Sequence, residues 1–67
     1  MASTRVSYGG KVYLVSWDRR GEPLSVEVHV AATFWRIIWE RPKRRSSLVA
    51  AVITSAEAVE PRDGSKQ

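Results

Sequence analysis

The chain has 67 residues, a formal net charge of +4 and no cysteine. This length allows one small domain, and the absence of cysteine excludes disulfides and thiolate metal sites. Apolar runs long enough for a signal peptide or a membrane-spanning helix are also missing, which predicts a cytoplasmic protein. We expect a single domain over residues 4–60, with flexible ends at 1–3 and 61–67, stabilised by its aromatic core or by forming a homo-oligomer.

A Gly-Gly pair at positions 9–10 separates two β-prone runs, 5–8 and 11–17. Paired glycines accept the positive φ values of a two-residue hairpin turn. This turn sets the register, in which Tyr8 opposes Lys11. The predicted core face of the hairpin consists of Val6, Tyr8, Tyr13, Val15 and Trp17.

Residues 24–30 have the clearest strand pattern in the sequence and follow a turn over 18–23. Apolar and polar side chains alternate strictly along this run, as in a half-buried strand. The apolar side is formed by Leu24, Val26, Val28 and Val30, and the polar side by Ser25, Glu27 and His29. The sequence therefore predicts a third antiparallel strand here.

Residues 31–41 are ambiguous, because aromatic residues and isoleucines favour strands by propensity. On a helical wheel, however, the apolar residues of this segment fill one continuous arc. In a strand, Arg36 and Glu40 would share a face with core residues. Periodicity therefore predicts a helix that ends at or before Arg41, since Pro42 follows.

Ser46 and Ser47 suit the N-terminus of a second helix that runs to residue 60. Its apolar stripe consists of Leu48, Val49, Val52, Ile53, Ala56 and Val59. The alternative is a strand over 48–54, followed by one helical turn capped by Thr54. The four alanines of the segment favour the helix.

The predicted fold class is therefore α+β, with a three-stranded antiparallel sheet followed by two helices. The alternative is an all-β barrel of five strands, two of them at 33–40 and 48–54. That barrel needs a tight turn at 31–33 without Gly, Asn or Pro, which is poor turn chemistry.

Catalytic chemistry finds little support in the sequence. His29 is the only histidine, and no cysteine stands near it to build a metal site or a nucleophile relay. The carboxylates show no paired spacing, and no glycine-rich phosphate loop is present. The sequence predicts a protein that is not an enzyme and that needs no cofactor or metal.

The positive charge is concentrated in residues 34–45, which hold five of the eleven basic residues and a single acid. The excess of four charges in this window equals the net charge of the chain. Arginine forks and lysine point charges contact phosphates without reading sequence. The candidate nucleic-acid-binding residues are Arg41, Lys43, Arg44 and Arg45, joined by Arg19 and Arg20 if the two loops lie on one side. The alternative interpretation of the run 41–45 is a solvated loop or a targeting signal.

Trp35 and Trp39 are candidate partner-binding residues, because the apolar arc of the predicted helix is wider than one small sheet needs. Trp39 lies at the rim of that arc and is expected to be exposed. A tryptophan beside arginines suits base stacking, a protein hot spot or a membrane interface. The alternative function is therefore a protein-interaction module, such as an inhibitor, a regulatory subunit or a self-associating domain. A membrane surface is the least favoured partner.

Residues 10–23, GKVYLVSWDRRGEP, place a glycine before an aromatic strand and end in an Asp-x-x-Gly turn. With the strand and helix expected after it, this stretch resembles the small N-terminal, arm-binding type DNA-binding domains of tyrosine recombinases. The resemblance implies a three-stranded sheet that enters the major groove and packs on a helix, with DNA favoured over RNA. The outward residues that it implies at the DNA are Lys11, Ser16, Ser25, Glu27 and His29.

Overall fold

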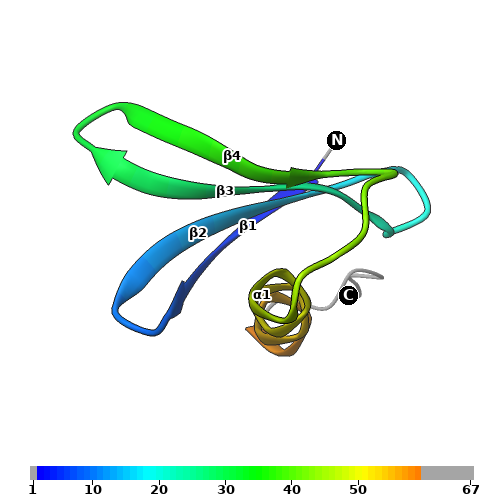
Figure 1. The fold of residues 1–67 in the computed structure, drawn as a ribbon. Helices are drawn as coiled ribbons and strands as arrows, with labels where there is room; N and C mark the ends of the chain where they lie inside the picture. The colour runs from blue at the N-terminus through cyan, green and yellow to red at the C-terminus, as the bar shows by residue number, and fades with distance from the viewer. Residues whose placement is uncertain (1, 60–67) are drawn as a thin grey trace.

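A computed structural model of the protein describes residues 2–59. Within these residues, four strands form one antiparallel sheet and a single helix lies against one face of it (Figure 1). The elements are β1 (Ala2–Tyr8), β2 (Lys11–Trp17), β3 (Pro23–Ala31), β4 (Phe34–Glu40) and α1 (Ser47–Val59). The strands follow one another in the order β1-β2-β3-β4. The α+β class is confirmed, whereas the division into three strands and two helices is wrong.

The hairpin of β1 and β2 has the predicted register, with Val6 opposite Tyr13 and Tyr8 opposite Lys11. Its turn is closed by two glycines with φ values of 58° and 81°. Nothing lies within 4 Å of a Cβ built at either glycine, so the positive φ and not lack of space selects glycine here. β1 begins at Ala2, earlier than predicted.

The helix predicted over 31–41 is absent, and residues 34–40 form β4 instead. The pairing of β3 with β4 steps from Val26–Trp39 to Glu27–Ile37, so Ile38 is an extra residue in a β-bulge. The bulge places Trp39 on the core side and Ile37 on the opposite side. The apolar residues of β4 therefore lie on both faces of the strand. On a helical wheel the same residues form one continuous arc, like that of an amphipathic helix.

The turn between β3 and β4 consists of Ala32 and Thr33, the residues whose turn chemistry looked poor. Ala32 has a φ of 23°, at the edge of the left-handed region that non-glycine residues avoid. The imidazole Nε2 of His29 donates a hydrogen bond of 2.9 Å to the Ala32 carbonyl oxygen and supports this backbone. A local side-chain contact therefore compensates for the missing glycine.

The second predicted helix is confirmed as α1, so the strand alternative over 48–54 is wrong. Ser46 caps it, because the Ser46 Oγ accepts a hydrogen bond of 3.2 Å from the Val49 backbone N–H. Leu48 and Val59, at the ends of the predicted stripe, are exposed. The helix contacts β1, β2 and β3.

The core lies between α1 and the face of the sheet that carries Val6 and Val15. It consists of Val6, Tyr13, Val15, Trp17, Val26, Trp39, Val49, Val52, Ile53 and Ala56. Trp17 is 3% exposed, as predicted, and its Nε1 donates a 2.8 Å hydrogen bond to the buried Thr4 hydroxyl. We call the opposite face of the sheet, which α1 does not cover, the outer face.

Candidate nucleic-acid interface

The six basic residues predicted from the sequence meet at one end of the sheet, which we call the basic end. Figure 1 shows the turn between β2 and β3 beside the linker that leads from β4 to α1. Arg41 joins the two segments: its Nη1 donates to the Asp18 Oδ2 at 2.9 Å, and its backbone N–H donates to the Leu24 carbonyl at 2.9 Å. The basic end comprises Arg19, Arg20, Arg41, Lys43, Arg44 and Arg45.

Asp18 organises the turn between β2 and β3. Its Oδ1 accepts hydrogen bonds of 2.9 Å from the backbone N–H groups of Arg20 and Glu22. The hydrogen bond from the Arg41 guanidinium, together with these backbone bonds, lowers the pKa of Asp18 below its ordinary value of 3.8. The carboxylate is therefore ionised at neutral pH, and it holds the turn so that Arg19 and Arg20 project into solvent.

Trp39 anchors the linker between β4 and α1. It is 5% exposed, and its Nε1 donates a 2.7 Å hydrogen bond to the Lys43 carbonyl oxygen. The Arg45 guanidinium carbon lies 5.4 Å from the centroid of the Trp39 ring, within cation–π range. The expectation that Trp39 is exposed is wrong, because the bulge in β4 turns its side chain toward the core.

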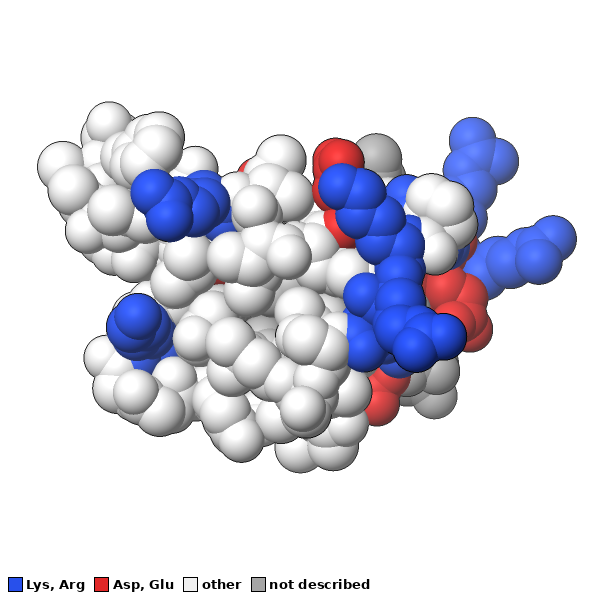
Figure 2. Space-filling view, in the orientation of Figure 1, with Lys and Arg blue, Asp and Glu red and all other residues white. Residues whose placement is uncertain are grey.

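Figure 2 shows most of the basic side chains on the visible face together at one end of the molecule, with acidic side chains among them and further basic groups near the opposite end. All six are exposed, and three carboxylates lie in the same two segments, those of Asp18, Glu22 and Glu40. Within residues 2–59, Arg41 is the only one of the six cations that forms an ion pair. Of the other five, Arg45 lies over the Trp39 ring, and the remaining four present their charges to solvent, in an arrangement suited to an extended polyanion.

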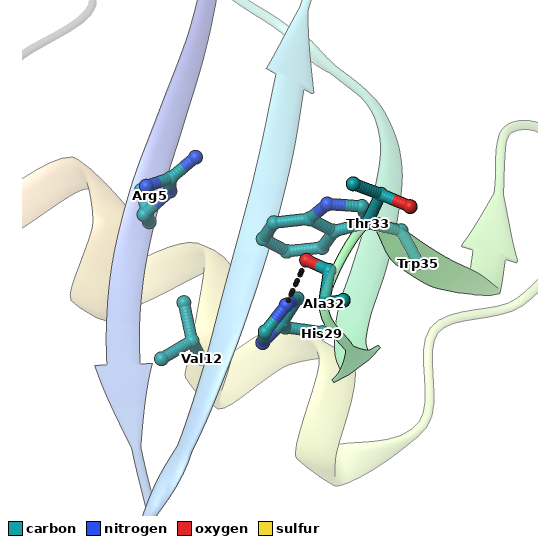
Figure 3. A pocket seen from close by; sticks show the side chains of 6 residues that line it. All are labelled: Arg5, Val12, His29, Ala32, Thr33 and Trp35. Carbon is teal, nitrogen blue, oxygen red and sulfur yellow. Dashed lines mark hydrogen bonds between the residues drawn. The ribbon is translucent and has the colours of Figure 1, made fainter.

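The outer face carries a second feature, around Trp35. Trp35 is half-buried, and its ring centroid lies 4.8 Å from that of His29. The guanidinium carbon of Arg5, on β1, lies 5.6 Å from the Trp35 ring centroid. Figure 3 shows the pocket of about 430 Å³ that they border, lined by Arg5, Val12, His29, Ala32, Thr33 and Trp35. The sequence pattern does not reveal this cluster, because it forms only when residues 34–40 are a strand beside β3.

The residues that the recombinase resemblance places at DNA divide between the two faces. Ser16 pairs with Ser25, and Glu27 and His29 follow on the same side of β3, so these four lie on the outer face. Lys11 does not join them. It alternates in phase with Tyr13 and therefore lies on the helix side of the sheet, which corrects that part of the expectation.

The helix in the described part of the chain is not long and apolar enough to cross a membrane. Residues 2–59 also contain no group of three or more His, Cys, Asp or Glu side chains placed to hold a metal ion. The sequence matches no protein-family model, and neither a curated protein nor a solved structure matches it. Similarity to the recombinase domains stays a prediction that rests on residues 10–23.

Proposed function

We propose that this protein binds nucleic acid by holding its phosphates at the basic end. The observation that carries the proposal is the 2.9 Å ion pair between Asp18 and Arg41, which are 23 residues apart in the chain. This ion pair brings the turn with Arg19 and Arg20 against the basic linker. Two clusters that are separate in sequence thus form one surface.

The chemistry of this surface suits phosphate groups. Arginine guanidinium groups match the geometry of phosphate oxygens, and Lys43 adds a mobile point charge. Contacts of this kind position a backbone and carry no sequence information. They also do not distinguish DNA from RNA, so the resemblance of residues 10–23 makes DNA the first ligand to test.

The test is a titration of labelled duplex and single-stranded oligonucleotides at low salt. Replacing Lys43 and Arg44 by alanine removes two exposed cations from the basic end without removing a side chain that the fold uses. The matched control is Lys11→Ala with Arg36→Ala, which removes two exposed cations far from the basic end. We expect the first pair to weaken binding about tenfold or more and the control pair to weaken it much less. Equal losses in the two variants, or a wild-type protein that does not bind, would contradict the proposal.

A second candidate function is protein interaction through the hairpin of β3 and β4. Three large apolar side chains of this hairpin are half-exposed, namely Val30 (50%), Phe34 (55%) and Ile37 (52%). Exposed apolar surface of this kind is typical of a contact with another protein or with a second copy. Light scattering coupled to size-exclusion chromatography tests it: a dimer that Phe34→Ser dissociates would support this candidate, and a monomer at all concentrations would count against self-association.

A further inference from the structure

The Trp35 pocket lies where the two halves of the sheet separate. β2 and β3 are paired from Trp17–Pro23 to Tyr13–Val28, whereas the pairing of β3 with β4 continues to the hairpin turn. The end of the β1–β2 hairpin therefore diverges from the end of the β3–β4 hairpin (Figure 1). Val12 and His29 face this gap from its two sides.

Trp35 is held in place at the mouth of the gap. Figure 3 shows its indole lying across β2, with Arg5 on one side and the turn at 32–33 on the other. The His29 ring beside it is fixed by the hydrogen bond to the Ala32 carbonyl. A half-buried aromatic ring with a fixed neighbour loses little conformational entropy when a flat ligand stacks on it.

The lining indicates the chemical class of that ligand. None of the six described lining residues carries a carboxylate, whereas Arg5 is a permanent cation and His29 is a hydrogen-bonding imidazole. The Arg5 guanidinium lies over the Trp35 ring, so a flat ring that stacks there displaces it, and the displaced cation can then bind an anion of the same ligand. A nucleotide has both, with its base against the indole and its phosphate toward Arg5.

We propose that the Trp35 pocket stacks an unpaired base of a single-stranded nucleic acid, an inference that rests on the proposed phosphate binding at the basic end. In a duplex the bases are paired and stacked inside the helix, so they do not reach the pocket. The protein should therefore prefer single strands to duplexes.

The outer face between the two sites fits this arrangement. With a rise of about 3.3 Å per residue, the distance along β2 from Trp17 to Val12 is about 17 Å, which a few nucleotides can span. The small hydroxyl pair Ser16 and Ser25 lies nearest the basic end. Glu27 lies closer to the pocket, and its carboxylate repels phosphates. The bound nucleic-acid strand would therefore turn its bases toward the sheet and its phosphates toward solvent.

The experiment compares a labelled oligothymidylate with the same chain carrying abasic sites. We expect the wild-type protein to bind the oligothymidylate about 5- to 150-fold more tightly than the abasic chain, the range of one base–aromatic stack. Trp35→Leu should abolish this difference, and Trp35→Phe should retain part of it. The matched control is Phe34→Leu, which removes an exposed aromatic ring outside the pocket and should keep the full preference.

The outcomes separate the two proposals. Binding that depends on Lys43 and Arg44 but is equal for the normal and the abasic chain would overturn the stacking inference and leave phosphate binding intact. A preference for bases that survives in Trp35→Leu would also overturn it. Should Trp35→Leu fail to fold, the fluorescence of the wild-type protein decides: quenching by oligothymidylate and not by the abasic chain supports stacking at Trp35, and equal quenching contradicts it.

Discussion

The two ends of the sheet are held in different ways. At the basic end, Trp39 is hydrogen-bonded to the Lys43 carbonyl and Arg41 is paired with Asp18, so the turn and the linker are tied to the core. At the opposite end the hairpins diverge, and Val30 and Phe34 are exposed. We call the basic end the closed end, because hydrogen bonds tie its turn and linker to the core. We call the opposite end the open end, because the two hairpins diverge there.

Binding and stability are therefore coupled at the basic end. Ordering a charged loop costs conformational entropy, and the hydrogen bonds at the basic end meet that cost during folding, before a ligand arrives. Changes to the side chains that make these bonds, those of Trp39, Asp18 and Arg41, should alter both stability and phosphate binding. The exposed apolar side chains of the open end bury little surface, so changes to them should leave stability almost unchanged.

The largest expected effect is that of Trp17→Ala, in the core beneath the closed end. Loss of this buried ring should destabilise the protein by about 3–5 kcal/mol, enough to unfold a domain of this size. Thr4→Val, which removes only the acceptor of the Trp17 Nε1 hydrogen bond, should cost about 1 kcal/mol. Urea unfolding followed by circular dichroism measures both, and a folded, cooperative Trp17→Ala protein would show that the core is assigned wrongly.

Trp39→Phe should have an intermediate effect. It keeps an aromatic ring in the core but removes the donor to the Lys43 carbonyl, at a cost of about 1 kcal/mol. Because the linker is then less ordered, the affinity for oligonucleotides should fall as well. Unchanged affinity with reduced stability would mean that the linker needs no anchoring to bind.

Acidification should destabilise the closed end, with a smaller effect on the melting temperature than these substitutions have. The pKa of Asp18 is lowered in the folded protein, so its ion pair with Arg41 contributes stability above pH 3.8, and this contribution is lost as the pH falls through the lower, folded pKa. The Asp18→Asn variant should lack this stability contribution already at neutral pH, although its side chain retains the Oδ1 acceptor. The difference in melting temperature between the wild type and the variant should therefore shrink below about pH 4, and a constant difference would contradict the assignment.

The smallest effect is expected at the open end. Phe34→Ser replaces a side chain that is more than half exposed and should change the free energy of unfolding by no more than about 0.5 kcal/mol. The same urea titration measures it. A loss above about 1 kcal/mol would show that Phe34 is covered, for instance by a second copy of the chain.

Local chemistry decided which parts of the fold could be predicted. The Gly-Gly turn set the hairpin register, the alternation of 24–30 identified β3, and the capping serine with its alanines identified α1. β4 was not predicted, because the bulge at Ile38 places Ile37 and Trp39, which are two residues apart, on opposite faces of the strand. Only the pairing with β3 reveals this feature. The turn at Ala32 was not predicted, because it is stabilised by a hydrogen bond from the His29 side chain.

The candidate sites divide in the same way. The basic residues stood out as a concentration of charge in the sequence. That these residues converge in space could not be predicted, because the convergence depends on the long-range contact between Asp18 and Arg41. The neighbours of Trp35 could not be found either, because Arg5 and His29 approach it only across the assembled sheet.

The most direct test of phosphate binding at the basic end is the salt dependence of its affinity. For a single-stranded oligonucleotide held through four to six phosphates, log affinity against log salt should have a slope of about −3 to −4, at about −0.7 per contact. In the Lys43→Ala, Arg44→Ala double variant the slope should become shallower by about 1.4, whereas the Lys11→Ala, Arg36→Ala control should keep the wild-type slope. A wild-type slope near zero, or an unchanged slope in the Lys43 and Arg44 variant, would contradict the account.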